Sequence, residues 1–173
     1  MPLPIAHGII GASIVAAMLP DASPVRNWKL LLLGAAIATC ADFDYFLKTS
    51  LHRGVTHSLI FAAILGLACF AVWGRANIRL AIGLAGAAFS HGLLDFATTR
   101  TMPGVELLWP VSERRFGLGL VDYYQLTGVD PVLFLYQDVL ADLLKMASIE
   151  LLISVPVFLF VLSVKWSVRN FSR

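Results

Sequence analysis

The chain consists of long apolar segments separated by short polar clusters, and this pattern limits its fold more than any other feature. Five segments are candidate membrane helices, at about residues 5–19, 28–41, 58–73, 78–97 and 148–166. Apolar residues make up 58% of the 173 residues and charged residues only 14%. A soluble fold of this composition would leave too much apolar surface in water. We therefore predict an all-α polytopic membrane helical bundle with about five membrane helices.

One further helix is expected to lie along the membrane surface. Residues 131–146 are amphipathic, with Asp138 and Asp142 four positions apart among leucines and other apolar residues. The small residues between Gly83 and Ala88 favour close helix packing. Without repeats or low-complexity tracts, we expect a single integral membrane domain over residues 1–173, with its motifs in residues 1–120.

The charge pattern excludes one class of partner and indicates an orientation. The net charge is only +2 and the basic residues are scattered, so no nucleic-acid partner is expected. If each segment crosses the membrane once, Arg26, Lys29, Arg75 and Arg79 fall in short loops on one side. The positive-inside rule makes that side cytoplasmic. We expect a multi-pass protein of the cell inner membrane whose other side, which carries the polar clusters, is non-cytoplasmic.

The polar clusters contain all four histidines and stand at the ends of apolar segments. Charged groups beside hydrocarbon are costly, so they mark a candidate site. Counting the crossings places three regions and their seven candidate ligands on one membrane side. These candidates are His7, Asp42, Asp44, His52, His57, His91 and Asp95.

Imidazole nitrogens and carboxylate oxygens are ligands of divalent metals. His91 and Asp95 are four positions apart, so they share one helix face and can reach a common ion. We expect one or two divalent ions, zinc first, with manganese or magnesium as alternatives. A hydrogen-bonding role for His7, a proton-relay role for the His91–Asp95 pair and a helix-capping role for Asp42 and Asp44 remain open.

These motifs together resemble the YdjM-like family of inner-membrane proteins, which are described as metal-dependent hydrolases. The resemblance covers about residues 1–120. It rests on five features in order, namely His7, Asp42-x-Asp44, the string His-Arg-Gly-x-Thr-His-Ser at residues 52–58, His91-x-x-x-Asp95, and Leu-Leu-Trp-Pro-x-Ser at residues 107–112. The resemblance implies a metal site built from these residues.

The motif order is also similar to that of the zinc phospholipase C and single-strand nuclease superfamily, whose helical enzymes hydrolyse phosphoesters with a zinc cluster. This chain departs from their pattern because no histidine follows His91 and because its N-terminus is Met-Pro. A site with one or two metals is therefore expected in place of three.

We expect a membrane-embedded hydrolase that cleaves a phosphoester in a lipid or lipid-linked substrate of the bilayer. Asp44 is the candidate general base, and Arg53 and Arg114 are candidates for neutralising the phosphate, since guanidinium groups bind phosphate in bidentate fashion. Protein partners are not indicated by the sequence.

Two other functions fit the same residues. A transporter would use them as a cation or proton pathway, although the chain lacks the internal repeat common in transporters. A non-catalytic membrane adaptor would use them as a structural metal site. Ligands gathered at one interface around an open pocket favour hydrolysis, a polar path to the other face favours transport, and a closed four-ligand site favours the adaptor.

Overall fold

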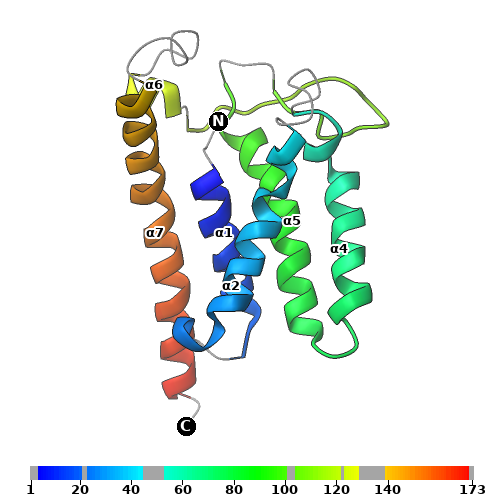
Figure 1. Cartoon of the computed structure of the whole chain (residues 1–173), viewed down its shortest axis with the longest axis vertical. Helices are drawn as coiled ribbons and strands as arrows, with labels where there is room; N and C mark the ends of the chain where they lie inside the picture. The colour runs from blue at the N-terminus through cyan, green and yellow to red at the C-terminus, as the bar shows by residue number, and fades with distance from the viewer. Residues whose placement is uncertain are drawn as a thin grey trace.

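A computed structural model describes residues 4–20, 23–44, 53–100, 104–121, 123–128 and 139–171, apart from the side chains of residues 123 and 124. The described part is helical and contains no strand, only one isolated bridge between Val105 and Phe116 (Figure 1). Its elements are α1 (Pro4–Met18), α2 (Pro24–Thr39), η1 (Cys40–Phe43), η3 (Val55–His57), α4 (Leu59–Trp73), α5 (Ile78–Thr98), α6 (Tyr123–Thr127) and α7 (Val139–Phe171). The predicted all-α class is confirmed.

Local capping signals decide where several helices begin. The Ser23 hydroxyl accepts a hydrogen bond from the N–H of Arg26, and Pro24 follows in the first turn, so α2 begins four residues before the expected position. Ser58 caps α4 in the same way, and the Asn77 side chain accepts from the N–H of Leu80 at the start of α5.

The expected number of about five membrane helices is too high. Five main helices occur in the expected order, but among the described residues only α5 and α7 are long and apolar enough to cross a bilayer by length and composition. The apolar helices α1 and α4 have 15 residues each, or roughly 22 Å, against a hydrocarbon core of about 30 Å. The 16-residue α2 carries Arg26 and Lys29 in its first two turns.

The separate interfacial helix is also not found. Residues 131–138 lie outside the described residues, and residues 139–146 continue without a break into the last apolar segment as the 33-residue α7. The amphipathic pattern ended at Met146, but no helix-breaking residue stands there. Pro156, inside α7, does not end the helix either.

Glycines bring α1 and α2 into close contact. A Cβ placed on Gly11 would lie 2.4 Å from the Cβ of Ala38 and 2.6 Å from the carbonyl oxygen of Gly34. The small residues of α5 serve both neighbours, since Gly83 faces Val15 of α1 and Ala85 faces Gly66 of α4. Small side chains thus set the spacing of the bundle, as the sequence predicted.

Helix α7 holds α1 at both ends. The buried Glu150 carboxylate accepts the N–H of Ala6 at 3.0 Å in the first turn of α1. The Lys165 ammonium donates to the carbonyl oxygens of Ala16 (2.9 Å) and Leu19 where α1 ends. An anion at the N-terminus and a cation at the C-terminus both complement the helix dipole, so α1 is fixed along its own axis.

A loop covers the end of the bundle where the polar clusters lie. The Leu107 carbonyl accepts the N–H of Leu59, and the N–H groups of Leu118 and Leu120 bond carbonyls in the last turns of α5. Figure 1 shows the 104–121 segment crossing the upper ends of α4 and α5.

The close contact of α1 and α2 gives a first prediction. Gly11→Ala is expected to destabilise the protein in detergent by about 1–3 kcal/mol, because overpacking at a close backbone approach forces the helices apart. Gly8→Ala, one turn earlier in the same helix, is the matched control, since its Cβ would meet its nearest neighbour at 3.6 Å. Thermal unfolding followed by circular dichroism measures both. Equal melting temperatures for the two variants would contradict this account.

The distribution of basic residues gives a second prediction. Cysteine at Val111, which is 92% exposed on the 104–121 loop, should react with a membrane-impermeant thiol reagent in intact spheroplasts once Cys40 and Cys69 are replaced. Cysteine at the exposed Asn170, at the opposite end of the bundle, should react only after permeabilisation. The reverse pattern would place the polar end in the cytoplasm.

Candidate metal centre

Four predicted ligands from three regions of the chain meet at one point. Asp42 lies in η1 after α2, His57 ends η3 before α4, and His91 and Asp95 lie one turn apart in α5. Each offers one nitrogen or oxygen, and these four atoms lie within 4.8 Å of one another. Asp42 is 14% exposed at its side chain, and the other three are 0–2% exposed. The site is therefore a buried cluster near one end of the bundle.

The separations within the cluster suit ligands of a common ion. Nε2 of His57 lies 3.6 Å from Oδ1 of Asp42 and 3.2 Å from Oδ2 of Asp95, and Nε2 of His91 lies 3.6 Å from Oδ1 of Asp42. In a tetrahedral site with bonds of about 2.1 Å, neighbouring ligand atoms are roughly 3.4 Å apart. The cluster could hold a metal ion with little rearrangement.

Backbone contact fixes the orientation of His91. Its Nδ1 lies 2.6 Å from the carbonyl oxygen of Ala38, so Nδ1 carries the proton and donates it. Nε2 is then the atom with the free lone pair, and it faces Asp42. Metal-binding histidines in proteins are usually held by this kind of outer contact.

Asp44 and Thr56 orient His57. The Thr56 hydroxyl donates to Oδ2 of Asp44 and lies 3.1 Å from Nδ1 of His57, and the same carboxylate oxygen is 3.6 Å from that nitrogen. Nε2 of His57 is thereby turned toward Asp42 and Asp95. Asp44 thus stands behind the imidazole, on the side away from the four ligand atoms.

The carboxylates also set the charge of His57 when no metal is bound. Burial alone would lower the pKa of His57, but contacts with Asp42 and Asp95 and the charge of Asp44 outweigh burial and raise it to about 9. Burial would raise the pKa of Asp42, but His57 and His91 lower it. His57 is therefore protonated at neutral pH, and a metal ion entering the cluster would replace that proton.

His7 completes the cluster from α1. Its Nε2 lies 3.3 Å from Oδ1 of Asp95, and its ring stacks on that of His91 with centroids 4.1 Å apart. His7 thus contacts the free oxygen of a carboxylate whose other oxygen faces His57. The structure places it beside the four-ligand set, as an additional ligand or as support for Asp95.

Several buried atoms in the cluster lack hydrogen bonds. Both oxygens of Asp42, both oxygens of Asp95 and Nε2 of His91 are buried and make no hydrogen bond of good geometry to the described part of the chain. Such groups are costly unless something satisfies them. Once His57 has lost its proton, Asp42 and Asp95 carry a charge of −2, so a divalent cation fits both the unsatisfied atoms and the charge.

A glycine allows η3 to approach α5. A Cβ on Gly92 would lie 2.3 Å from the carbonyl oxygen of His57. A side chain at residue 92 would therefore clash with the backbone of η3. Because residue 92 has no side chain, His57 can reach the level of His91 and Asp95. The glycine between the paired ligands is thus as necessary to the cluster as the ligands.

The other candidate residues lie in different surroundings. Arg53 is buried, adopts a left-handed backbone with φ 65°, and its carbonyl accepts the N–H of Glu106. Arg114 lies exposed on the 104–121 loop. His52 falls outside the described residues.

Sequence reasoning missed Glu150. Its side chain is fully buried in α7 and bonds the N–H of Ala6, next to His7. An acidic residue near the start of an apolar segment was the available signal, because a charge there requires a partner. Glu150 fixes the turn of α1 that carries His7.

An apolar bundle with a buried His–Asp cluster at one end defines a membrane protein with a candidate metal centre. The model of the YdjM inner membrane protein family matches residues 1–171, and the chain belongs to this family. The resemblance found in the motifs and the expected inner-membrane location are thereby confirmed.

A curated relative agrees with this membership. The inner membrane protein YbcI of Escherichia coli (strain K12) is 39% identical over 112 residues, which are 62% of this chain and 57% of the relative. The chain thus matches little more than half the length of that relative. No solved structure matches the chain.

The cluster gives a third prediction. His91→Ala and Asp95→Asn should each lower bound zinc in the purified protein by at least about tenfold, since each removes one donor from a small set. Ser90→Ala is the matched control, because Ser90 adjoins His91 but its hydroxyl bonds the carbonyl of Ala87 in its own helix. Metal analysis by mass spectrometry measures occupancy. Full zinc occupancy in both ligand variants would exclude these residues as ligands.

Proposed function

We propose that this protein is a membrane-embedded metal-dependent hydrolase that cleaves a phosphoester in a lipid or lipid-linked substrate. The observation that carries the proposal is the buried donor set of Asp42, His57, His91 and Asp95, whose atoms lie within 4.8 Å of one another. Mixed imidazole and carboxylate donors are typical of hydrolytic metal sites.

Zinc is the metal that we propose first. Two imidazoles and two carboxylates suit zinc, while manganese and magnesium favour sites with more oxygen ligands. The described cluster has donors for one ion. A second ion would draw on His7 and on residues such as His52.

A bound divalent ion would supply Lewis-acid polarisation of a phosphoryl oxygen and a water of lowered pKa. We assign to Asp42, the most exposed member of the cluster, the role of accepting a proton from an attacking water. This role replaces the one expected for Asp44, because Asp44 contacts the far nitrogen of His57. Arg53, three residues before Thr56, is the better candidate than the exposed Arg114 for binding phosphate near the cluster.

The position of the cluster supports a substrate that reaches the site from the membrane. His91 and Asp95 lie toward the C-terminal end of α5, which is long and apolar enough to cross a bilayer, and His7 lies in the first turn of α1. In a bilayer crossed by α5, these turns would lie near the end of the hydrocarbon core, where lipid phosphates begin. A phosphoester attached to a lipid is therefore the substrate class that matches the depth of the site.

A structural metal site is the second candidate function. Three of the four side chains are at most 2% exposed, and four protein ligands would fill a tetrahedral zinc ion and leave no position for water. A non-catalytic adaptor would have these features. Transport is less favoured, because the described ligands gather at one end of the bundle.

Activity measurements separate these functions. Purified protein in lipid nanodiscs is supplied with zinc and a panel of phospholipids and lipid-linked phosphoesters, and released products are identified by mass spectrometry. We expect turnover that chelators abolish, that Asp42→Asn reduces by at least about 100-fold, and that Asp44→Asn reduces by about 10–100-fold. Ser90→Ala should keep full activity.

The other outcomes identify the alternatives. Stoichiometric zinc without turnover of any substrate, together with a lowered melting temperature after chelation, would contradict hydrolysis and favour the structural site. Zinc uptake into proteoliposomes that depends on Asp95 would favour transport.

A further inference from the structure

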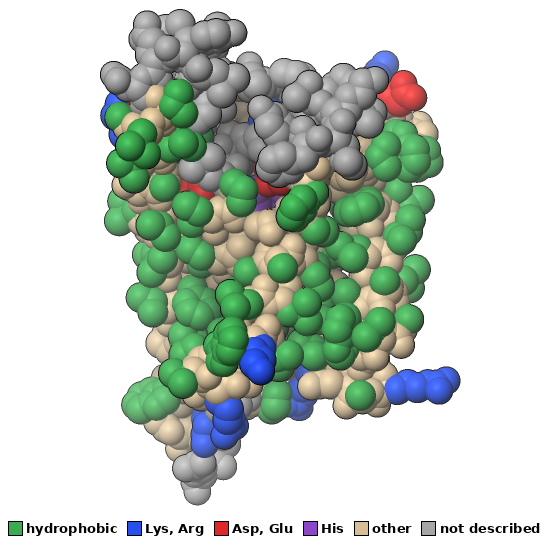
Figure 2. Space-filling view, in the orientation of Figure 1, with side chains coloured by type: hydrophobic (Ala, Val, Ile, Leu, Met, Phe, Trp, Pro, Cys, Tyr) green, Lys and Arg blue, Asp and Glu red, His purple; other side chains and the backbone are tan. Residues whose placement is uncertain are grey.

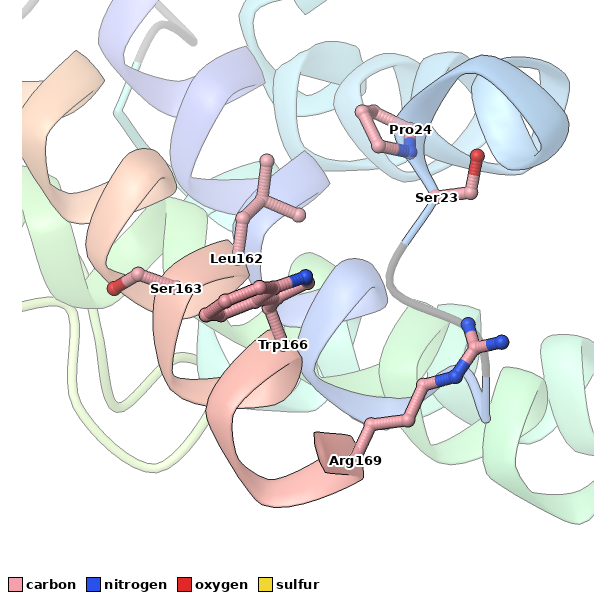
Figure 3. Close-up of a pocket in the computed structure, with 6 residues that line it drawn as sticks. All are labelled: Ser23, Pro24, Leu162, Ser163, Trp166 and Arg169. Atoms are coloured by element: carbon pink, nitrogen blue, oxygen red, sulfur yellow. The ribbon is translucent and has the colours of Figure 1, made fainter. Parts of the chain in front are cut away.

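A pocket lies at the end of the molecule opposite the metal centre. It has a volume of about 500 Å³ and is lined by Ser23, Pro24, Leu162, Ser163, Trp166 and Arg169. Figure 3 shows Leu162 and Trp166 projecting from α7 toward the start of α2, with the Arg169 guanidinium at the edge of the same space. The pocket therefore combines apolar walls with a cationic rim.

A second pocket adjoins the first and shares Arg169. It has a volume of about 520 Å³, and its lining includes Met18, Arg79, Val164 and Lys165. Lys165 donates to the terminal carbonyls of α1. Arg79 and Arg169 are thus the cationic side chains that edge this double pocket from α5 and α7.

The residues around the double pocket are typical of the membrane surface. Only 11% of the residues in the most apolar part of α7 are buried within the protein, so this part of the helix exposes an apolar surface suited to lipid. Trp166 is 65% exposed and lies in the last two turns of α7, where tryptophans usually mark the boundary between hydrocarbon and water. A lipid headgroup is therefore the ligand that we expect to meet this pocket.

The charge around the double pocket selects the kind of headgroup. Six basic residues gather at this end of the described structure, namely Arg26, Lys29, Arg75, Arg79, Lys165 and Arg169, and no described acidic residue accompanies them (Figure 2). One acidic residue, Asp21, stands in the sequence between α1 and α2, and it lies outside the described residues. The described charged side chains at this end are all basic, and they complement an anionic group.

We propose that this double pocket binds an anionic phospholipid. The phosphate and its charged headgroup contact Arg169 and Arg79. One acyl chain lies along the exposed apolar face of α7, where Leu159 is 57% and Val164 is 43% exposed. The site is separate from the metal centre and does not depend on the proposed hydrolysis.

Lipid affinity measured by native mass spectrometry tests the proposal. The delipidated full-length protein in detergent is titrated with phosphatidylglycerol and with phosphatidylcholine of the same acyl chains. We expect the wild type to prefer phosphatidylglycerol by at least about fivefold, the effect of one basic residue near an anionic lipid. Arg79→Gln/Arg169→Gln should remove this preference, whereas Arg169→Lys should keep most of it.

Arg75→Gln is the matched control, because Arg75 is exposed at the same end but lines neither pocket. This variant should keep the wild-type preference. All substituted arginines are exposed, and circular dichroism verifies that each variant is folded. Equal affinity of the wild type for the two lipids, an equal loss in Arg75→Gln, or displacement of the lipid by equimolar inorganic phosphate would each overturn the proposal.

Discussion

The burial of carboxylates and imidazoles among apolar helices is the constraint on which the rest of this structure depends. Asp42, His57, His91 and Asp95 can remain at one point only if each side chain is oriented and its charge is compensated. The Ala38 carbonyl orients His91, and Asp44 with Thr56 orients His57. Close helix packing at glycines brings these groups within reach. The same packing that builds the bundle thus builds the site.

The arrangement around the cluster separates residues that could touch a metal from those that hold them. His57 and His91 each present Nε2 inward and have Nδ1 held from outside. Both rings are thus oriented before any ion binds, so binding requires loss of the His57 proton but little rearrangement of the side chains. The same rigidity would serve a hydrolase and a structural zinc site, which is why activity and metal content must be measured together.

The sequence predicted the convergence of the site better than the details of the helices. Counting apolar segments placed His7, Asp42, His57 and His91 on one side, and the structure brings them together. The count of membrane helices failed because segments of 15 residues are apolar but short. The predicted boundary between two helices before residue 148 was wrong, because the hydropathy changes there while the backbone continues as one helix, α7. Asp44 reaches His57 across the connection between α2 and α4, and Glu150 reaches α1 from a helix distant in sequence. Residue spacing alone does not reveal either contact.

The attachment of α7 to both ends of α1 has a consequence for how the protein is made. The four ligand residues of the cluster lie within the first 95 residues, whereas Glu150 and Lys165 belong to the last helix of the described chain. During synthesis, the first and last turns of α1 can gain these two partners only after α7 has been made. The turn that carries His7 therefore gains its contact with Glu150 only after all four ligand residues have been synthesised.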